Sequence, residues 1–319
     1  MERELEKEHI KRTYVKDAFR EHYISLLGSE EAYEQFIDRA LEFPRRCIRV
    51  NTLKRSVEEI TRRLRRKGWQ LEEVPWCAEG FFIERDDRRD VGNLEEHALG
   101  YIYVQEASSM IPAGVLGARA GDLVLDMAAA PGSKSSQIAA GMENQGVLVA
   151  NELDYTRIAA LKANLERLGV VNAIITNTDG RRIRLDGFNR VLVDAPCSGT
   201  GTISKSLKTL EMWNLKSLAR LHRLQLGLLE HAYALLREGG VVVYSTCSLE
   251  VEENERVLDV FFSRHPEARC EELTISPDQS VPLDRYGDVV FDGRVQNAVR
   301  LWPHLTGTDG FFVARICKP

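Results

Sequence analysis

The sequence lacks the features that would place its 319 residues in a membrane or outside the cell. No apolar run approaches the roughly 20 residues that a membrane-spanning helix needs. Residues 1–7 lack the apolar core of a signal peptide, and the chain shows neither internal repeats nor a low-complexity linker. We therefore expect a cytoplasmic protein that acts without a membrane.

Cysteine is scarce, and its spacing argues against two kinds of site. The cysteines are Cys47, Cys77, Cys197, Cys247, Cys270 and Cys317. They lie far apart and include no Cys-x-x-Cys pair of the kind that holds zinc. In a chain without an export signal, thiols stay reduced. We therefore expect neither structural disulfides nor a bound metal.

Positive charge is also in deficit, since 43 Lys and Arg face 48 Asp and Glu and leave a net charge of −5. This balance argues against indiscriminate binding of nucleic acid. Residues 45–67 are an exception, because ten Lys or Arg and only Glu58 and Glu59 give this segment a balance of +8. Such a patch can neutralise RNA phosphates, although an ordinary solvated helix face would look the same.

The chain divides into two parts by its expected secondary structure. Apolar residues at helical spacing predict helices over residues 1–43, with a break at Gly28 and a helix cap at Ser29. Strands at 47–51, 70–74 and 80–84 and a helix at 56–67 follow. We expect residues 1–104 to form a helical and α+β lobe that binds RNA, and residues 105–319 to form a second domain.

From residue 122 onward, apolar runs alternate with helical segments. This alternation predicts βαβ units and an α/β fold with a doubly wound, mostly parallel sheet. The expected strands are 123–126, 147–151, 173–176, 190–194, 241–246 and 310–316. The expected helices are 133–142, 155–168, 218–236 and 252–265.

Acidic residues recur at or just after the ends of four expected strands. They are Asp126, Glu152, Asp179 and Asp194. In an open parallel sheet, ligands bind beyond the carboxyl ends of the strands, at the switch in strand order. Glu152 fits a partner for two ribose hydroxyls, and Asp179 fits an acceptor for an adenine amine. This edge of the sheet is therefore the expected cofactor site.

The loop after the first of these strands supports the same interpretation. It leads from strand to helix, the form of a nucleotide-type cofactor site, and Gly132 would let bare backbone approach the ligand. It does not fit a phosphate-binding P-loop, because Ser133 precedes Lys134 and Ala128 takes the place of the earlier glycine. Together with two cysteines at strand ends, it indicates an S-adenosylmethionine enzyme.

Cys197 follows the strand that ends at Asp194, and Cys247 follows the strand at 241–246. A thiolate that adds to one carbon of an electron-poor ring makes the neighbouring carbon nucleophilic enough to attack a methyl group. Neighbouring strands would bring both thiols together, with Asp194 facing the edge of such a ring. Spacing alone leaves open which cysteine attacks. Two buried structural cysteines are the alternative.

The chain resembles the Sun-type RNA (cytosine-5) methyltransferase family, of an archaeal type acting on tRNA or rRNA. The resemblance lies in Asp-Ala-Pro-Cys-Ser-Gly at 194–199, Thr-Cys-Ser at 246–248 and Ala-Ala-Pro-Gly-Ser-Lys at 129–134. It implies a seven-stranded, Rossmann-like methyltransferase sheet. It also implies cofactor binding by Ala128, Ala129, Ala130, Pro131, Gly132, Ser133, Lys134, Glu152, Asp179 and Asp194. The departures are Ala128 and Glu152, where many relatives have Cys and Asp.

The resemblance also assigns the two thiols. Cys247 is implied as the nucleophile that adds to cytosine C6, which turns C5=C6 into an enamine that can attack the methyl group. Asp194 would then face the pyrimidine edge, and Cys197 is implied as the group that assists product release. Lys134 and Lys205 are candidates for orienting the target nucleotide, although residues 203–208 lack the Asn-Pro that relatives often carry. His304, in a C-terminal pattern of the family, is expected to be structural.

We therefore expect a monomeric RNA cytosine-C5 methyltransferase that acts on tRNA, with rRNA as the second choice. A DNA cytosine-5 methyltransferase is the alternative enzyme, and its Pro-Cys nucleophile would select Cys197. A catalytically silent RNA-binding factor is the alternative outside enzymes. The presence of both cysteines and of all four strand-end acids argues against that factor.

Overall fold

The protein is described from a computed structural model of residues 2–85, 91–276 and 278–319. Three helices open the chain, α1 (Glu2–Tyr14), α2 (Asp17–Leu27) and α3 (Glu30–Ala40). The break between α2 and α3 lies where it was predicted. Gly28 has a φ of 84°, and the Ser29 hydroxyl accepts a 3.1 Å hydrogen bond from the Ala32 amide. Glycine adopts that φ without strain, and the hydroxyl pairs an amide that the first helical turn leaves free.

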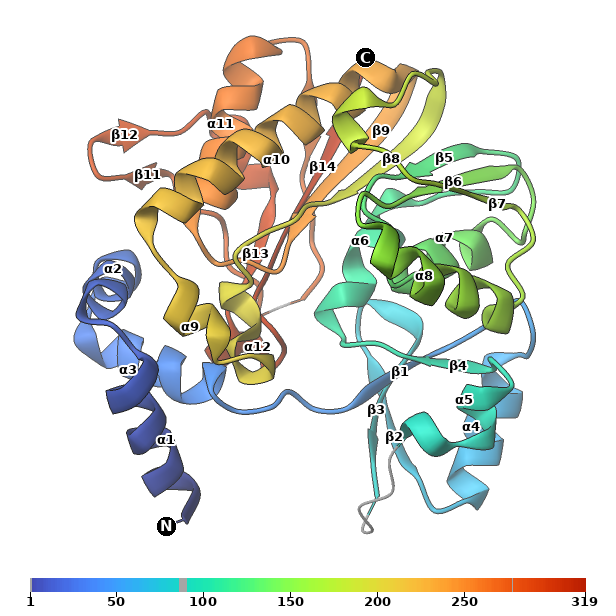
Figure 1. Cartoon of the computed structure of the whole chain (residues 1–319), viewed down its shortest axis with the longest axis horizontal. Coiled ribbons are helices and arrows are strands. Elements are labelled where there is room, and N and C mark those ends of the chain that lie inside the picture. Colours follow the sequence, from blue (N-terminus) through green and yellow to red (C-terminus); the bar gives the residue numbers. More distant parts are fainter. Residues whose placement is uncertain (1, 86–90, 277) are drawn as a thin grey trace.

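The N-terminal helices pack against the C-terminal half of the chain, at the left of Figure 1. The ring of Phe19 meets Trp213 edge-on, with centroids 5.3 Å apart, and Phe36 meets Trp302 in the same way at 5.8 Å. The chain then crosses through residues 41–46 to a separate sheet. Helices α2 and α3 therefore share a hydrophobic core with residues that lie far away in the sequence.

An antiparallel sheet with the strand order β2-β3-β1-β4 forms a small lobe at the lower right of Figure 1. It contains β1 (Cys47–Val50), β2 (Gln70–Val74), β3 (Cys77–Glu84), β4 (Ile102–Val104), α4 (Val57–Arg66) and α5 (Glu95–Ala98). The predicted basic helix is α4, and Ile60 and Leu64 anchor it on Ile48 and Phe81 of the sheet. Burying this apolar stripe leaves arginines on the opposite, solvated face.

The large sheet has the strand order β10-β14-β9-β8-β5-β6-β7, with β13 beside β14. Its parallel strands are β5 (Leu123–Asp126), β6 (Val147–Asn151), β7 (Ala173–Thr176), β8 (Phe188–Asp194) and β9 (Leu236–Thr246). Its antiparallel strands are β10 (Arg269–Glu271), β13 (Val299–Leu301) and β14 (Phe311–Cys317). The doubly wound sheet is confirmed, with eight strands rather than seven, because β10 and β13 both pair with the same edge of β14.

Helices cover both faces of the large sheet. On one face, Val191 and Val193 of β8 share a core with α10 (Leu215–Leu235) and α11 (Glu255–Arg264). On the other face, Leu192 shares a core with α6 (Ile111–Leu116) and α7 (Ser133–Gly141), and α8 (Tyr155–Leu168) lies beside α7. Strands buried on both faces read as unbroken apolar runs, which is why the sequence revealed them.

Short elements complete the described ranges. They include α9 (Lys208–Met212), α12 (Pro303–Thr306) and a hairpin of β11 (Arg285–Tyr286) and β12 (Val289–Val290). Within these ranges, no helix has both the length and the apolar composition needed to cross a membrane. The order of the parallel strands reverses between β5 and β8, and the carboxyl ends there are where ligands bind in such sheets.

Candidate active site

The two predicted cysteines lie just beyond the carboxyl ends of neighbouring parallel strands. Strand β8 ends at Asp194 and is followed by Cys197, while β9 ends at Thr246 and is followed directly by Cys247. The two Sγ atoms are 3.1 Å apart. All six cysteines are free thiols, so this contact is a hydrogen bond and not a disulfide. The predicted proximity of Cys197 and Cys247 is confirmed.

The surroundings of Cys197 favour its protonated form. The hydrogen bond with Cys247 and burial raise the pKa of the Cys197 thiol well above its ordinary value, and the nearby carboxylate of Glu253 acts in the same direction. A low-dielectric site and a neighbouring negative charge both disfavour a thiolate. At neutral pH, Cys197 therefore keeps its proton and can donate it.

An ion pair lies beside the thiols. The Lys134 ammonium is 2.8 Å from Asp194 Oδ2 and donates a 3.0 Å hydrogen bond to the Ser109 hydroxyl. Burial disfavours the charge of Lys134, but the carboxylate of Asp194 outweighs it and raises the pKa of the ammonium. Asp194 Oδ1 accepts a 2.9 Å hydrogen bond from the Ser245 hydroxyl. This pair offers both a donor and an acceptor to a polar ring edge.

The loop that carries the predicted cofactor residues turns sharply at Gly132. Its φ is 103°, and a Cβ there would come within 3.2 Å of Leu161 Cδ1, so only glycine fits without strain. Helix α7 begins at the next residue, and its Ser135 hydroxyl donates a 2.6 Å hydrogen bond to Asp126. Burial raises the pKa of Asp126 to about 6.

Glu152 and Asp179 lie after β6 and β7, as predicted, but their partners differ. Glu152 is 4% exposed and accepts hydrogen bonds from the Ala130 amide at 3.2 Å and the Asp154 amide at 2.9 Å. Asp179 is held by its neighbour Arg181 at 2.6 Å, and this hydrogen bond lowers the pKa of the carboxyl to about 2. Glu152 thus also braces the loop before it, whereas Asp179 stays ionised near the surface.

This edge of the sheet fits a ligand that offers amine and hydroxyl donors. Buried Asp126 Oδ1 has no hydrogen-bond partner among the described residues, and leaving such an acceptor unpaired is costly. The carboxylates of Glu152 and Asp194 are each bonded but retain further acceptor capacity. The donor-rich nucleoside and amino-acid ends of the expected cofactor match this set of acceptors.

Two other predicted residues are engaged with the protein. Lys205 forms an ion pair with Asp309. His304 packs near the rings of Phe36 and Trp302, at centroid distances of 6.1 and 6.0 Å, and burial lowers the pKa of the imidazole. Such packing is typical of a structural histidine.

The basic segment at residues 45–67 is partly neutralised by carboxylates outside it. Arg63 and Lys67 form ion pairs with Glu95 and with buried Glu96, and Arg45 pairs with Glu72. Exposed arginines remain on α4. They are Arg62, Arg65 and Arg66, none of which has a carboxylate within ion-pair distance in the described part of the chain.

Sequence reasoning missed Glu253, which lies under both cysteine loops and accepts hydrogen bonds from Ser198 and Ser248. Glu252 and Glu253 lie just before helix α11, which begins at Glu255, and acidic residues at that position usually only stabilise a helix start. The only hint of this role in the sequence was that Glu253 lies a few residues after a cysteine at a strand end.

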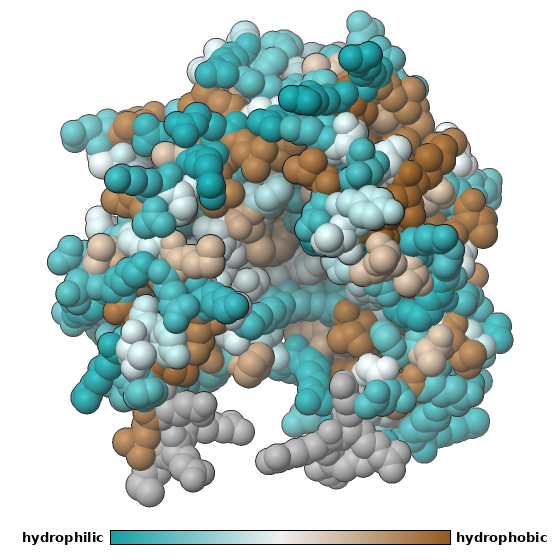
Figure 2. Space-filling view, viewed as in Figure 1, coloured by the Kyte–Doolittle hydropathy of each residue, from teal (hydrophilic) through white to brown (hydrophobic). Residues whose placement is uncertain are grey.

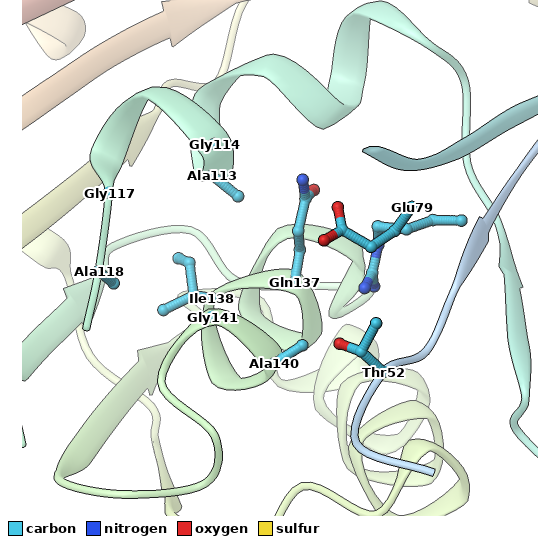
Figure 3. Close-up of a pocket in the computed structure, with 11 residues that line it drawn as sticks. Thr52, Glu79, Ala113, Gly114, Gly117, Ala118, Gln137, Ile138, Ala140 and Gly141 are labelled. Atoms are coloured by element: carbon cyan, nitrogen blue, oxygen red, sulfur yellow. The ribbon is translucent and has the colours of Figure 1, made fainter. Parts of the chain in front are cut away.

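Cavities border the small lobe, and two of them extend to its neighbours. One, of about 570 Å³, is lined by Phe43, Pro44, Arg45, Arg46, Cys47, Val104, Gln105, Glu106 and Lys205. Figure 2 shows that the middle of this face is hollowed between the N-terminal helices and the small lobe. The other cavity, of about 210 Å³, receives Glu79 of β3, Gln137 of α7 and Thr52 (Figure 3). The second cavity contains none of the predicted site residues.

Family models match both parts of the chain. Residues 113–317 match the family described as 16S rRNA methyltransferase RsmB/F, and residues 15–107 match the N-terminal domain of 16S rRNA methyltransferase RsmF. The chain is 42% identical, over 324 residues, to ribosomal RNA small subunit methyltransferase F of Vibrio parahaemolyticus. That alignment covers 96% of this chain and 63% of the relative, so the chain spans less than two thirds of the length of that protein.

Solved structures resemble the chain over nearly its full length. A methyltransferase homolog protein from Pyrococcus horikoshii superimposes with a TM-score of 0.87 at 36% identity, covering 99% of this chain and 98% of that one. NSun6 from Pyrococcus horikoshii, solved with SFG, has a TM-score of 0.79 at 26% identity, with 96% and 98% covered.

Proposed function

The chain belongs to the 16S rRNA methyltransferase RsmB/F family, and from this we propose that it transfers a methyl group from S-adenosylmethionine to C5 of a cytosine in RNA. The observation that carries the proposal is the contact between two thiols, 3.1 Å apart, at the carboxyl edge of the sheet. Two neighbouring free thiols beside a buried Lys–Asp pair are typical of a catalytic site and favour an enzyme over a binding or scaffolding protein. We place the reaction in the cytoplasm.

We assign Cys247 as the nucleophile and Cys197 as the proton-bearing partner. The Cys247 thiolate adds to cytosine C6, the C5=C6 pair moves to C5, and C5 accepts the methyl group. Transfer of the C5 proton to solvent water then restores the double bond and expels the Cys247 thiolate, to which the neighbouring Cys197 thiol can donate a hydrogen bond. The raised pKa of Cys197 supports this assignment, because that thiol still holds its proton when the adduct must be resolved.

Lys134 and Asp194 act on the cytosine ring in this proposal. Their side chains are held 2.8 Å apart beside the thiols. A carboxylate can accept from the exocyclic amine, and an ammonium can stabilise charge that develops on the ring. Burial of Lys134, which is 9% exposed, would strengthen both effects.

We assign the cofactor to residues 128–134, Glu152, Asp179 and Asp194. SFG, bound to the NSun6 neighbour, is an analogue of S-adenosylmethionine. The cofactor supplies a methyl group on a sulfonium centre. The protein would hold it with acceptors at the ends of β5 and β6, while Gly132 keeps the turn open for its approach.

Glu152→Ala is expected to weaken S-adenosylmethionine binding by about 1–3 kcal/mol, the range for losing a hydrogen bond to a charged group. The change also frees the Ala130 amide that the carboxylate holds in the loop. Calorimetry on the RNA-free protein measures the effect. Glu166→Ala, at an exposed position on α8, is the matched control and should bind normally. Equal affinity of both variants would remove Glu152 from the site.

The RNA class is the least constrained part of the proposal. The sequence alone favours tRNA, but the relatives are named as methyltransferases of ribosomal RNA of the small subunit. We therefore propose rRNA as the first substrate to test. Purified protein, labelled S-adenosylmethionine and unmodified rRNA or tRNA would be combined, and bisulfite sequencing would locate the 5-methylcytosine. Methylation of DNA alone would favour the Pro-Cys chemistry of DNA enzymes.

We further propose that residues 1–104 contribute the RNA contact through the small lobe, and that residues 105–319 form the methyltransferase domain. The exposed arginines of α4 support an RNA contact at the small lobe. The N-terminal helices contact Trp213 and Trp302 instead, so we assign them to bracing the methyltransferase domain.

Replacing Arg62, Arg65 and Arg66 by Gln should flatten the slope of log affinity against log salt by about 2, since each phosphate contact to single-stranded RNA contributes about 0.7. Cofactor affinity should not change. The control replaces Lys216, Arg220 and Arg223, three exposed residues of α10. RNA binding would be measured by fluorescence anisotropy at several salt concentrations. An unchanged slope would leave the arginines as a solvated face.

A further inference from the structure

Glu253 joins the two cysteine loops beneath the thiols. Its side chain is fully buried. Oε1 accepts a 2.9 Å hydrogen bond from the Ser198 amide and a 2.8 Å bond from Gln225 Nε2. Oε2 accepts a 2.5 Å bond from the Ser198 hydroxyl and another from the Ser248 hydroxyl. One carboxylate therefore binds the residues that directly follow Cys197 and Cys247.

These contacts lie just beyond the end of the hydrogen-bond ladder between β8 and β9. The last residue pair in the β8–β9 ladder is Asp194 with Ser245. Two more backbone hydrogen bonds follow: the Ala195 amide donates to the Ser245 carbonyl at 2.8 Å, and the Gly201 amide donates to the Cys247 carbonyl at 2.9 Å. Cys197 lies between these two anchor points. Over this stretch the Cys197 loop contacts the Cys247 loop through side-chain hydrogen bonds, which help to set the distance between the thiols.

The network around Glu253 closes on both loops. The hydroxyls of Ser198 and Ser248 are 3.0 Å apart, and Gln225 of α10 also donates a 2.9 Å bond to the Pro196 carbonyl, next to Cys197. Burial raises the pKa of the Glu253 carboxyl, and the hydrogen bonds from Ser198, Ser248 and Gln225 act against this shift. The Ser198 amide and Gln225 Nε2 can only donate to the carboxyl group, while the two hydroxyls can donate or accept. An apolar residue in this place would leave several buried donors unpaired.

We propose that Glu253 is a positioning residue that holds Cys197 and Cys247 at contact distance, so that both thiols serve the same cytosine in turn. The proposal rests on the function proposed above, in which both cysteines act. Glu253 itself lies behind the serines and touches no reacting atom. Its hydrogen bonds position the thiols through Ser198 and Ser248, and its charge also raises the pKa of the Cys197 thiol.

The distance between the thiols can be measured without activity. Phenylarsine oxide condenses with two adjacent thiols, forming two As–S bonds while its oxygen leaves as water with the two thiol protons. A single thiol holds arsenic weakly, so retention after dilution into a monothiol reports a close pair. The wild type should retain the reagent, and the Cys197→Ser and Cys247→Ser variants should lose it. This pattern assigns the retained arsenic to the active-site pair.

Glu253→Gln keeps the shape but replaces one acceptor oxygen by a donor. We expect at least tenfold faster loss of arsenic and about 100-fold slower methylation, the cost of a misplacement near 1 Å. The affinity for S-adenosylmethionine should stay within about twofold, which a general folding defect would not allow. Should this variant fail to fold, Ser198→Ala, which removes one hydroxyl donor, should show the same changes to a smaller degree.

Glu250→Gln is the matched control. Glu250 is equally buried in the same loop, but its carboxylate accepts bonds from the Tyr23 hydroxyl at 2.8 Å and Trp213 Nε1 at 2.9 Å. This variant should retain arsenic like the wild type, even with lower stability. Equal arsenic loss from both Glu variants, or normal retention in Glu253→Gln, would overturn the proposal. Methylation that survives in both cysteine variants would instead overturn the proposed function, while the arsenic result would still report the geometry.

Discussion

Cys197→Ala is expected to accumulate a covalent protein–RNA complex, whereas Cys247→Ala should form none and should lose methylation altogether. The expectation follows from the two roles assigned to thiols that lie 3.1 Å apart. Without the Cys247 thiolate, no adduct at C6 can form. Without Cys197, attack and methyl transfer proceed, but release should slow by about 10²–10⁴-fold, the range for a positioned proton-transfer group.

Denaturing gels of protein mixed with labelled RNA measure the trapped complex, which should require S-adenosylmethionine in Cys197→Ala. Cys270→Ala, at a buried cysteine on β10, is the control and should turn over normally. A complex that forms in Cys247→Ala but not in Cys197→Ala would reverse the assignment. The chemistry would then follow the Pro-Cys type of the DNA enzymes.

Arg300→Ala should destabilise the fold by about 3–5 kcal/mol, because it leaves the buried carboxylate of Glu255 without its cation. Arg300 is 1% exposed on β13, and its Nε and Nη2 bond Glu255 at 3.0 and 2.5 Å. Its Nη1 donates a 2.7 Å bond to the Leu249 carbonyl, two residues after Cys247. The pair thus joins β13, α11 and the nucleophile loop.

Urea unfolding followed by circular dichroism measures this loss. Lys162→Ala is the control, since its ion pair with Glu166 is exposed and should be worth less than about 1 kcal/mol. Replacing Arg300 and Glu255 together by apolar residues should restore part of the stability, because no buried charge is then left alone. A change below about 1 kcal/mol in Arg300→Ala would show that water reaches this pair.

The sequence was most informative where both faces of a strand are buried. The apolar runs of β5, β6 and β8 could be read directly, and the closeness of Cys197 and Cys247 followed from their places at neighbouring strand ends. Strands β10 and β13 were missed because each has three residues. Three residues are too few to show a hydrophobic periodicity, so these segments become recognisable as strands only through their pairing with β14.

Charge was harder to read than hydrophobicity. The charge of +8 at residues 45–67 was summed over that segment alone. In the structure, Glu95 and Glu96 of helix α5 form ion pairs with Arg63 and Lys67 and neutralise part of this charge. Asp179 was predicted as an acceptor for an adenine amine, and nothing in the sequence indicated that Arg181 also forms an ion pair with its carboxylate. Charged side chains interact according to their distance in the folded chain, so composition cannot show which of them remain free to bind a ligand.

The docking of the N-terminal helices also bears on the order in which the chain can fold. Arg39 donates a 2.8 Å hydrogen bond to the Gly307 carbonyl across 268 residues, and Tyr23 reaches Glu250 across 227. Synthesis makes α2 and α3 long before these partners exist, and contacts of such separation close slowly. The aromatic side chains of α2 and α3 must therefore stay exposed to solvent while the small lobe and the parallel strands form. Docking of α2 and α3 on the C-terminal half is then a late event in folding. The loop that follows Cys247 and contains Glu250 therefore gains its contact with Tyr23 only after that docking.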